Sequence, residues 1–321
     1  MAKVLNVNNL RVYFHTPLGP VKAVDGISFD LSPKERLGIV GESGSGKSTM
    51  AYALMRLIKK PGKIESGDIV VGDEKILELD ENEMRARRFS KISLIPQGSM
   101  NSLNPVMRIE EQLIDTIKAH DKNKSSISKT EKQEIVGKLL KSVGLEPGLG
   151  KRFPHELSGG MKQRVTIAMG ISLNPIVIIA DEPTSALDVV VQRQVMDTLE
   201  SAQERIGAGL ILVGHDMGLM AQFVDRIAVM YAGKIVELAP VETIFNKPLH
   251  PYTKMLINSL PKLDSHGVFN GIPGLPAQLL NLKEGCSFCL RIGRENKNEI
   301  PWVKVSKSHY IRECDVCADY N

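Results

Sequence analysis

The sequence predicts an α/β protein built on a parallel sheet, and two observations lead to this fold class. Four short runs of Ile, Val and Leu have the composition of strands covered on both faces: residues 36–40, 91–95, 176–180 and 209–213. Each run is followed at once by residues that can bind a ligand or take part in a reaction, namely a glycine-rich loop, Gln97, Asp181-Glu182 and His215. Because ligands of open α/β sheets gather at the carboxyl ends of the strands, these motifs predict one shared site.

The glycine-rich loop, residues 41–49, fits the phosphate-loop pattern G-x-x-x-x-G-K-[ST]. It follows a predicted strand and precedes a predicted helix over residues 48–60, which ends before Pro61-Gly62. Backbone N–H groups and a helix N-terminus therefore favour phosphate binding here, and a chance glycine turn would lack these flanking elements. The candidate binding residues are Gly41, Ser43, Gly44, Ser45, Gly46, Lys47, Ser48 and Thr49. Among them, Lys47 can reach the terminal phosphates and Ser48 can bind Mg²⁺.

The remaining chain has a different character. Residues 4–14 and 21–31 alternate apolar and polar side chains, which predicts an antiparallel β portion. Residues 98–160 predict a helical subdomain, with helices over 110–119 and 132–143 and a polar surface loop over 122–130. Proline and glycine become frequent after residue 245. We therefore expect a nucleotide-binding domain over residues 1–245 and a small, loop-rich C-terminal domain over residues 246–321.

Composition restricts the function only weakly. The 321 residues are 42% apolar and 24% charged, as is ordinary for a globular protein, and the net charge is +4. The basic cluster at residues 85–88 has no interleaved aromatic residues, so we interpret it as a solvated helix face rather than a nucleic-acid site. No apolar run approaches the ~20 residues that cross a bilayer, and the N-terminus lacks a secretory signal. We expect a cytoplasmic protein whose membrane role comes through a partner.

Two further motifs carry candidate chemistry. Asp181 ends an apolar run and is placed to hold Mg²⁺, and Glu182 beside it can deprotonate an attacking water; the alternative is a pair of helix-capping acids. Residues 157–161 open a helix with Ser158 as a natural N-cap and two glycines that admit a phosphate to the backbone. A capped helix is the simple interpretation of this turn. The alternative is a second anion site. One nucleotide has no need of two such loops in one subunit, but two subunits arranged head to tail would each bind the other's nucleotide with this turn.

These motifs, with residues 185–188, resemble the ATP-binding subunits of ABC transporters in order and spacing along residues 1–245. The resemblance narrows to the ATPases of oligopeptide and dipeptide importers. The segments that carry it are residues 102–105 (SLNP), 157–164 (LSGGMKQR), 230–237 (MYAGKIVE), 250–253 (HPYT) and 272–274 (IPG).

The resemblance implies a role for each matching residue. Residues 41–49 would hold the phosphates of ATP, with Ser48 and Asp181 on Mg²⁺. Glu182 would be the general base, and His215 would contact the γ-phosphate. Gln97 would contact the metal or water and report the nucleotide state to the membrane partner. Ser158, Gly159 and Gly160 would bind the γ-phosphate of the ATP held by the opposite subunit. Asp188 would bridge the dimer interface.

Family members also stack adenine on an aromatic residue about thirty positions before the phosphate loop. Phe14 fits this position best, and Tyr13 is the neighbouring option. The structural alternative for Phe14 is an inward-facing strand residue.

All four cysteines lie in the last 36 residues, as two C-x-x-C pairs: Cys286, Cys289, Cys314 and Cys317. In a cytosolic chain this pattern favours a metal over disulfides, and four unligated thiols would leave the confinement unexplained. Four thiolates suit a [4Fe-4S] cluster or Zn²⁺. We favour the cluster, because peptide-importer ATPases often carry a cysteine-containing C-terminal domain and some resemble iron–sulfur proteins there. The spacing here departs from theirs. We expect the metal site to be structural.

The function that follows is ATP hydrolysis that powers the import of dipeptides or oligopeptides. The implied partners are integral membrane permeases, a second ATPase subunit (a copy or a related chain) and, indirectly, an extracytoplasmic peptide-binding protein, at the cytoplasmic face of the membrane. The alternatives are import of metal chelates or oligosaccharides, or a soluble ABC ATPase that acts on nucleic acid or ribosomes. The absence of a fused second nucleotide domain and of a strongly basic arm counts against the soluble alternative.

Overall fold

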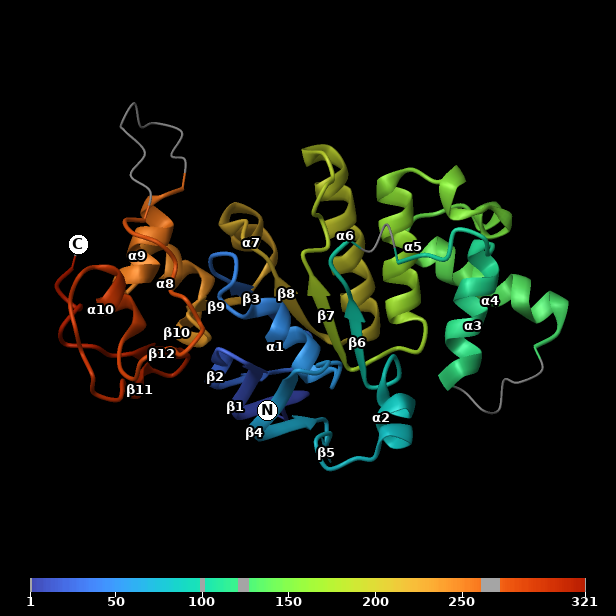
Figure 1. The fold of residues 1–321 in the computed structure, drawn as a ribbon. Helices are drawn as coiled ribbons and strands as arrows, with labels where there is room; N and C mark the ends of the chain where they lie inside the picture. Colours follow the sequence, from blue (N-terminus) through green and yellow to red (C-terminus); the bar gives the residue numbers. More distant parts are fainter. Residues whose placement is uncertain (1, 99–101, 121–126, 261–271, 321) are drawn as a thin grey trace. The chain divides into compact units, whose positions relative to one another are not determined.

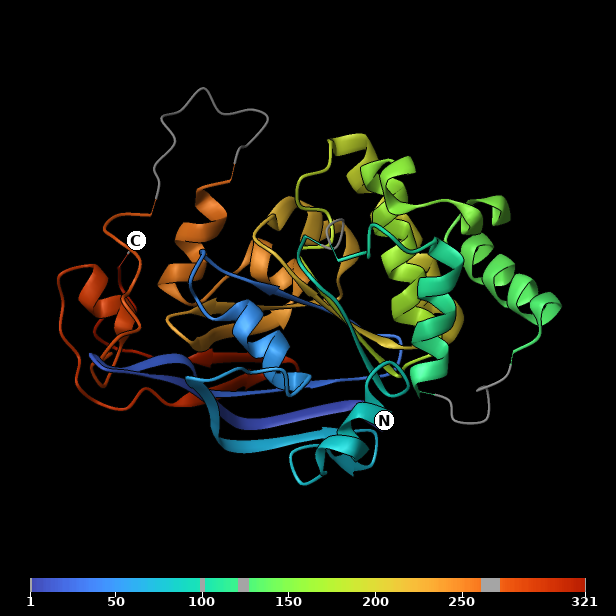
Figure 2. The same cartoon turned by 45° about the vertical axis from the view of Figure 1, so that its right-hand side comes forward.

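The computed structural model describes residues 2–98, 102–120, 127–260 and 272–320 (Figures 1 and 2). The chain divides into two compact units. Unit 1 comprises Met1–Leu5, Leu31–Glu35 and Val70–Ile211. Unit 2 comprises Asn6–Asp30, Arg36–Ile69 and Leu212–Asn321. Among the residues described, no helix combines the length and apolar character that a bilayer-spanning segment requires.

Unit 1 contains a parallel strand pair that carries two of the predicted motifs. Strand β6 (Ile92–Ile95) pairs with β7 (Val177–Asp181), and Ile95 lies opposite Ala180. Every residue of β7 is buried, as the sequence predicts for a strand covered on both faces. A short antiparallel pair joins the end of β4 (Gly62–Val71) to β5 (Glu74–Lys75), and α2 (Glu81–Arg87) follows.

The helical part of unit 1 confirms the helices predicted from the sequence. Helix α3 (Ile109–His120) packs against α4 (Lys129–Ser142) and α5 (Gly159–Ile171), and these three helices lie together in Figure 2. Two short 3₁₀ turns, Pro147–Lys151 and Pro154–Glu156, connect α4 to α5, and α6 (Val189–Ile206) follows β7. The predicted loop over 122–130 is wrong at its end, because α4 already begins at Lys129 with Ser128 as its N-cap. Residues 121–126 lie outside the described part of the chain, as do 99–101 of the predicted subdomain.

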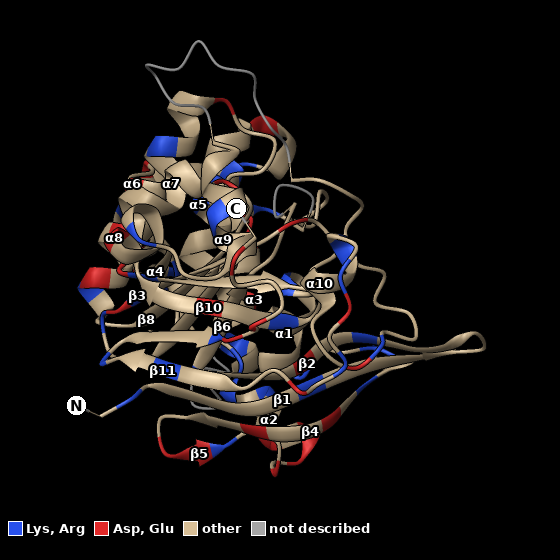
Figure 3. Ribbon diagram, turned by 90° about the vertical axis from the view of Figure 1, so that its left-hand side faces the viewer, with Lys and Arg blue, Asp and Glu red and all other residues tan. Residues whose placement is uncertain are grey.

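Unit 2 contains the predicted antiparallel β portion. Strands β1 (Leu5–Thr16) and β2 (Gly19–Leu31) are neighbours joined by the two-residue turn Pro17-Leu18, and such a short connection requires antiparallel strands. Their buried residues alternate with exposed or half-buried ones over most of their length. Basic and acidic residues are interspersed over β1, β2 and β4 (Figure 3), so no field of one sign forms there.

A second set of strands in unit 2 follows the order β11-β12-β10-β9-β3. Strand β3 (Arg36–Val40) is parallel to β9 (Arg226–Tyr231), and β9 is antiparallel to β10 (Lys234–Pro240). The C-terminal hairpin of β11 (Trp302–Ser306) and β12 (His309–Arg312) then extends this sheet, with Glu237 opposite Ile311. Figure 1 shows the red C-terminal strands beside the orange β10.

The helices of unit 2 follow its strands. Helix α1 (Lys47–Leu54) comes directly after β3 and the phosphate loop, and α7 (Met217–Phe223) comes after β8 (Gly209–Val213). Strand β8 contains the point where the chain passes from unit 1 to unit 2. The other helices are α8 (Val241–Asn246), α9 (Pro251–Asn258) and the short α10 (Ser287–Arg291).

Helix α1 ends six residues before the predicted end at residue 60. The N–H of Arg56 donates to the carbonyl of Ala53, and the N–H of Leu57 donates to the carbonyl of Tyr52, both at 2.9 Å. These two bonds form a Schellman motif, which closes the helix with Arg56 in the left-handed region at φ 50°. Glycine usually occupies this position, and its absence from the sequence explains why the prediction was wrong.

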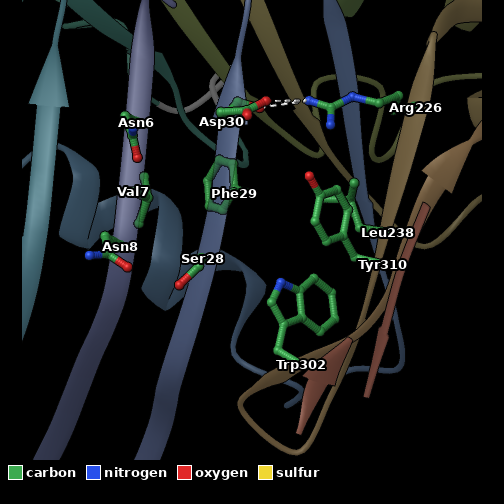
Figure 4. Close-up of a pocket in the computed structure, with 10 residues that line it drawn as sticks. All are labelled: Asn6, Val7, Asn8, Ser28, Phe29, Asp30, Arg226, Leu238, Trp302 and Tyr310. Atoms are coloured by element: carbon green, nitrogen blue, oxygen red, sulfur yellow. Dashed lines mark hydrogen bonds and ion pairs between the residues drawn. The ribbon is translucent and has the colours of Figure 1, made fainter. Parts of the chain in front are cut away.

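The C-terminal hairpin borders a pocket of about 190 Å³ in unit 2 (Figure 4). Trp302 and Tyr310 line one side with rings stacked at 5.8 Å, and β1 and β2 supply the other. The ion pair between Arg226 and Asp30, at 3.1 Å, lies at one end. The aromatic contact lies within the hairpin, and strand pairing of β12 with β10 joins the hairpin to the rest of unit 2. The predicted division of the chain at residue 245 stays a prediction.

Candidate functional site

The phosphate loop lies between β3 and α1 in unit 2, in the context that its sequence pattern requires. Gly46 directly precedes the helix, has φ 105° and makes no side-chain cap. A Cβ atom at this position would lie 2.0 Å from the carbonyl oxygen of Ala23, so the loop excludes any other residue here. Because Gly46 has no side chain, no side-chain cap occupies the start of α1, as an anion site at a helix start needs.

Lys47 supplies a positive charge within this loop. Its buried side chain donates from Nζ to the carbonyl oxygens of Gly41 and Glu42, each at 2.8 Å. A third contact, at 3.4 Å, joins Nζ to Oγ of Ser45. The ammonium group is thus held at the centre of the loop, where it favours bound phosphate. Ser48 and Thr49 are half-buried in the first turn of α1.

Gln97 and Glu182 meet in unit 1, as expected for residues that follow neighbouring parallel strands. The side chain of Gln97 donates from Nε2 to Oε2 of Glu182 at 2.7 Å. Asp181 is buried as the last residue of β7, and Glu182 follows it in the left-handed region at φ 45°. An unusual backbone conformation for a non-glycine residue is typical of functional sites.

The other predicted residues occupy helix starts or strand ends. Ser158 caps α5 by accepting from the N–H of Met161 at 3.4 Å, and Asp188 caps α6 by accepting from the N–H of Val191 at 3.0 Å. His215 is exposed and follows β8 after Gly214. A Cβ atom on Gly160 would lie 2.5 Å from a methyl carbon of Val191, so this glycine also permits α5 to pack closely on α6. The N-cap role predicted for Ser158 from the sequence is confirmed.

The structure therefore brings Gln97 and Glu182 together in unit 1 and assembles the phosphate loop in unit 2. That all these residues share a single site stays a prediction.

Both aromatic candidates for adenine stacking have structural contacts in unit 2. Tyr13 donates from Oη to Asp25 at 2.7 Å, and burial together with the Asp25 carboxylate raises the pKa of this phenol. Phe14 is half-buried at the end of β1, and a Cβ atom on Gly62 would lie 2.7 Å from its ring. Gly62 therefore leaves the space that the Phe14 ring uses.

Two residues that contact the phosphate loop, Tyr252 and Arg291, were not linked to it from the sequence. Glu42, the second residue of the loop, pairs with Arg291 and exchanges hydrogen bonds with Tyr252. Tyr252 belongs to the segment at 250–253 and Arg291 follows the first cysteine pair, so both are more than 200 residues from the loop. No local pattern could have connected them.

The four cysteines form one buried cluster in unit 2, and their Sγ atoms all lie within 4.8 Å of one another. The Sγ atoms of Cys286 and Cys317 are 3.9 Å apart, and those of Cys289 and Cys314 are 3.5 Å apart. A hydrogen bond from Cys317 lowers the pKa of Cys286 to about 5, and burial raises the pKa of Cys289. Asn296 donates from Nδ2 to the Sγ of Cys314 at 3.3 Å. Such a donor stabilises a thiolate, so the cluster has the chemistry of a metal site, as the sequence predicts.

Comparisons with known proteins agree with this geometry. Residues 24–185 match the sequence family described as ABC transporter, and residues 236–292 match the oligopeptide/dipeptide transporter C-terminal region. The chain belongs to the ABC transporter family. This ABC protein is 42% identical to the oligopeptide transport ATP-binding protein OppD of Bacillus subtilis over 322 residues, which cover 97% of this chain and 88% of that protein. It is 41% identical to the dipeptide transport ATP-binding protein DppD of Lactococcus lactis, with 97% and 90% covered.

Solved structures show the same cassette fold. The dimeric ABC transporter cassette MJ0796 matches with a TM-score of 0.65 at 28% identity, covering 74% of this chain and 98% of that one. The same cassette in a post-hydrolysis state bound to ADP and phosphate matches with a TM-score of 0.64 at 27% identity, with the same shares covered. The predicted fold class and the family resemblance are thereby confirmed, and this ABC protein is an ATPase subunit of the oligopeptide/dipeptide transporter branch.

Proposed function

We propose that this ABC ATPase hydrolyses ATP to power the import of dipeptides or oligopeptides. The observation that carries the peptide assignment is the match of residues 236–292 to the C-terminal region of oligopeptide and dipeptide transporters. Relatives named for oligopeptide or dipeptide transport at 41–43% identity support it. No observation favours metal chelates, oligosaccharides, nucleic acid or ribosomes over peptides.

The proposed roles are those that the family resemblance implies, and the contacts of Lys47 and of the Gln97–Glu182 pair support two of them. The phosphate loop and Lys47 bind the phosphates of ATP, and Ser48 and Asp181 hold Mg²⁺, which neutralises charge on the phosphates. Glu182 accepts a proton from the attacking water, and Gln97 orients the Glu182 carboxylate through their 2.7 Å hydrogen bond. His215 contacts the γ-phosphate, and Phe14 stacks on adenine.

The remaining roles require a second ATPase subunit. Ser158, Gly159 and Gly160 bind the γ-phosphate of the nucleotide held by that subunit, and Asp188 lies at the interface. ATP then closes the pair, and loss of the γ-phosphate contacts weakens it. Permease subunits convert this cycle into transport, with the chain at the cytoplasmic face of the membrane and a peptide-binding protein on the other side.

Purification of the tagged chain from its own membranes tests this assignment. We expect two integral membrane permeases and a second ATPase subunit to co-purify, and a di- or tripeptide to stimulate ATP hydrolysis by the reconstituted complex. Stimulation by oligosaccharides or metal chelates alone would overturn the peptide assignment. Co-purification with ribosomes or nucleic acid, and no permease, would favour the soluble ATPase.

For the cysteine cluster we propose one zinc ion held by Cys286, Cys289, Cys314 and Cys317, the alternative that the sequence left open. A tetrahedral zinc site with Zn–S bonds of about 2.3 Å separates its sulfur atoms by about 3.8 Å. The separations of 3.5 and 3.9 Å fit this geometry. In a [4Fe-4S] cluster each thiolate binds a different iron, which requires wider spacing than the 4.8 Å limit found here.

Elemental analysis of the protein purified without oxygen decides between these metals. We expect about one zinc per chain and no visible absorption from iron–sulfur charge transfer. About four iron atoms per chain with matching sulfide would establish the cluster expected from the family resemblance. The Cys286→Ser/Cys317→Ser variant should lose the metal in either case.

A further inference from the structure

Glu42 joins the phosphate loop to the C-terminal part of unit 2. Its carbonyl oxygen accepts from Lys47, while its carboxylate lies beside the guanidinium of Arg291. Tyr252 adds two contacts: its phenol oxygen accepts from the N–H of Glu42 at 3.2 Å and lies 3.4 Å from Oε2 of the same residue. Burial raises the pKa of Tyr252, so the phenol keeps its proton. Both the backbone and the side chain of Glu42 are therefore held.

Arg291 is the charged partner in this arrangement. Its guanidinium makes two parallel hydrogen bonds to Glu42, from Nη1 to Oε2 at 2.5 Å and from Nη2 to Oε1 at 3.1 Å. Its side chain is only 2% exposed. Nε donates to the carbonyl of Pro273 at 2.7 Å, and Nη2 lies 3.3 Å from the carbonyls of Ile272 and Gly274. The guanidinium also lies over the ring of Tyr231. Such a paired and enclosed arginine has one defined position.

Two of the four cysteines lie at or within the helix that carries Arg291. Cys286 is the N-cap of α10, Cys289 lies within it, and Arg291 is its last residue. The ring of Phe288, also in α10, packs against Tyr231 and Tyr252 with centroids 5.9 and 6.0 Å away. If both cysteines bound the same metal, α10 would have little freedom to rotate or unwind. A metal held by the cysteines would therefore have a ligand, Cys289, two residues before the arginine that pairs with the phosphate loop.

We propose that Arg291 is a positioning residue for ATP binding and that the cysteine cluster sets its position. Arg291 neutralises the Glu42 carboxylate next to the phosphate site and fixes the shape of the loop. Without Arg291, an unpaired negative charge remains beside the bound triphosphate and repels it. This inference rests on the proposed role of residues 41–49 in ATP binding, and it makes the metal site a determinant of nucleotide affinity as well as of tail structure.

The proposal differs from a purely structural role in the pattern of effects that it predicts. A structural cysteine site would stabilise the C-terminal part and leave ATP affinity unchanged. A positioning role predicts that ATP affinity falls when Arg291 is removed and recovers when the Glu42 charge is removed with it. It also predicts that loss of the metal and loss of Arg291 act through the same step, so their effects do not add.

Titration calorimetry with MgATP on the full-length, metal-loaded chain tests the first part. We expect Arg291→Ala to weaken MgATP binding about tenfold, within the usual range for coupled sites. Arg291→Lys should retain part of the affinity, because lysine supplies the charge without the paired hydrogen bonds. The double variant Arg291→Ala/Glu42→Gln should recover most of the loss, since no carboxylate is left unpaired. Failure of this rescue would overturn the electrostatic argument.

Arg294→Ala is the matched control. Arg294 also follows the first cysteine pair, but its guanidinium pairs with Asp319 at 2.9 Å and donates to the carbonyl of Val316. The Arg294→Ala substitution removes the same charge from the same segment without changing the contacts of Glu42. MgATP affinity should therefore stay within about twofold of the unchanged protein. An equal loss in Arg294→Ala would show that general loosening, and not Arg291, weakens ATP binding.

The Cys317→Ser variant tests whether the cysteine cluster sets the position of Arg291. Its metal content, the hydrogen exchange of the phosphate loop and its MgATP affinity are measured together. We expect loss of the metal, faster exchange at residues 42–46 and a fall in MgATP affinity similar to that of Arg291→Ala. When Cys317→Ser is added to the double variant Arg291→Ala/Glu42→Gln, MgATP affinity should change little further. Unchanged affinity and exchange in a metal-free variant would overturn the coupling. If the unchanged protein itself binds no MgATP, the proposed function fails instead.

Discussion

His309 and Glu237 form a buried pair that joins the C-terminal hairpin to β10. Nε2 of His309 lies 2.9 Å from Oε1 of Glu237, and the Glu237 residue has no exposed surface. The same carboxylate accepts from the backbone N–H groups of Leu249, at 2.8 Å, and His250, at 3.0 Å. One buried side chain therefore connects β10, the start of α9 and β12.

Removing His309 should destabilise the protein, because it leaves the Glu237 carboxylate buried with fewer partners. We expect His309→Ala to lower the free energy of unfolding by about 3 kcal/mol in urea unfolding. His309→Gln should recover part of this, since an amide can still donate. Lys307→Ala, at an exposed position of the same hairpin, is the control and should have little effect. Equal stability of His309→Ala and the control would show that the pair contributes nothing.

Burial of His250 makes stability depend on pH. The residue is fully buried, which lowers its pKa to about 3, while its Nδ1 accepts from the N–H of Tyr252 at the start of α9. An unfolded histidine titrates near 6.5, so between about pH 3 and 6.5 the unfolded state binds the extra proton and stability falls as pH falls. We expect this residue to contribute a loss of about 2 kcal/mol between pH 7 and pH 5.

His250→Asn tests this dependence, because asparagine keeps a helix-capping acceptor without a titrating group. The variant should be less stable at pH 7 but should lose less stability down to pH 5. The control, His155→Asn, replaces an exposed histidine and should keep the original pH dependence. The explanation fails if both variants have the same slope of unfolding free energy against pH.

Glu182→Gln should separate ATP binding from hydrolysis. The amide keeps the size of the side chain but cannot accept a proton, so phosphate release should fall about 10²–10⁴-fold while MgATP binding is retained. An ATP-bound pair of subunits should persist longer, which size-exclusion chromatography can measure. Glu204→Gln, at an exposed position of α6, should hydrolyse ATP at the normal rate. Normal turnover by Glu182→Gln would exclude Glu182 as the base.

Gly46→Ala should disable the phosphate loop through its backbone. The added methyl group meets the carbonyl of Ala23, and alanine is disfavoured at φ 105°. We expect a loss of roughly 3 kcal/mol of stability or a rearranged loop that no longer binds MgATP. Gly148→Ala introduces a methyl group where no atom lies within 4 Å and should leave binding unchanged. Full MgATP affinity in Gly46→Ala would contradict this account of the loop.

Local signals in the sequence were sufficient for most of the fold. The runs at 91–95 and 176–180 form β6 and β7, because short apolar runs rich in β-branched residues favour strands covered on both faces over helices. The end of α1 was missed because Arg56, and not glycine, takes the left-handed position. The family resemblance named the segments at 250–253 and 272–274 but assigned them no role. In the structure, Tyr252 of the first segment contacts Glu42, and Ile272 of the second contacts Arg291.

The sequence alone determined the phosphate loop, the carboxylate after β7 and the confinement of the cysteines, since each depends on residues that are neighbours in the chain. Tertiary structure decided the contacts between distant segments: the pairing of Arg291 with Glu42, the burial of Glu237 against His309 and the spacing of the four sulfur atoms. The physical reason is that backbone geometry fixes what adjacent residues do, whereas burial and charge pairing exist only after the strands and helices have packed together.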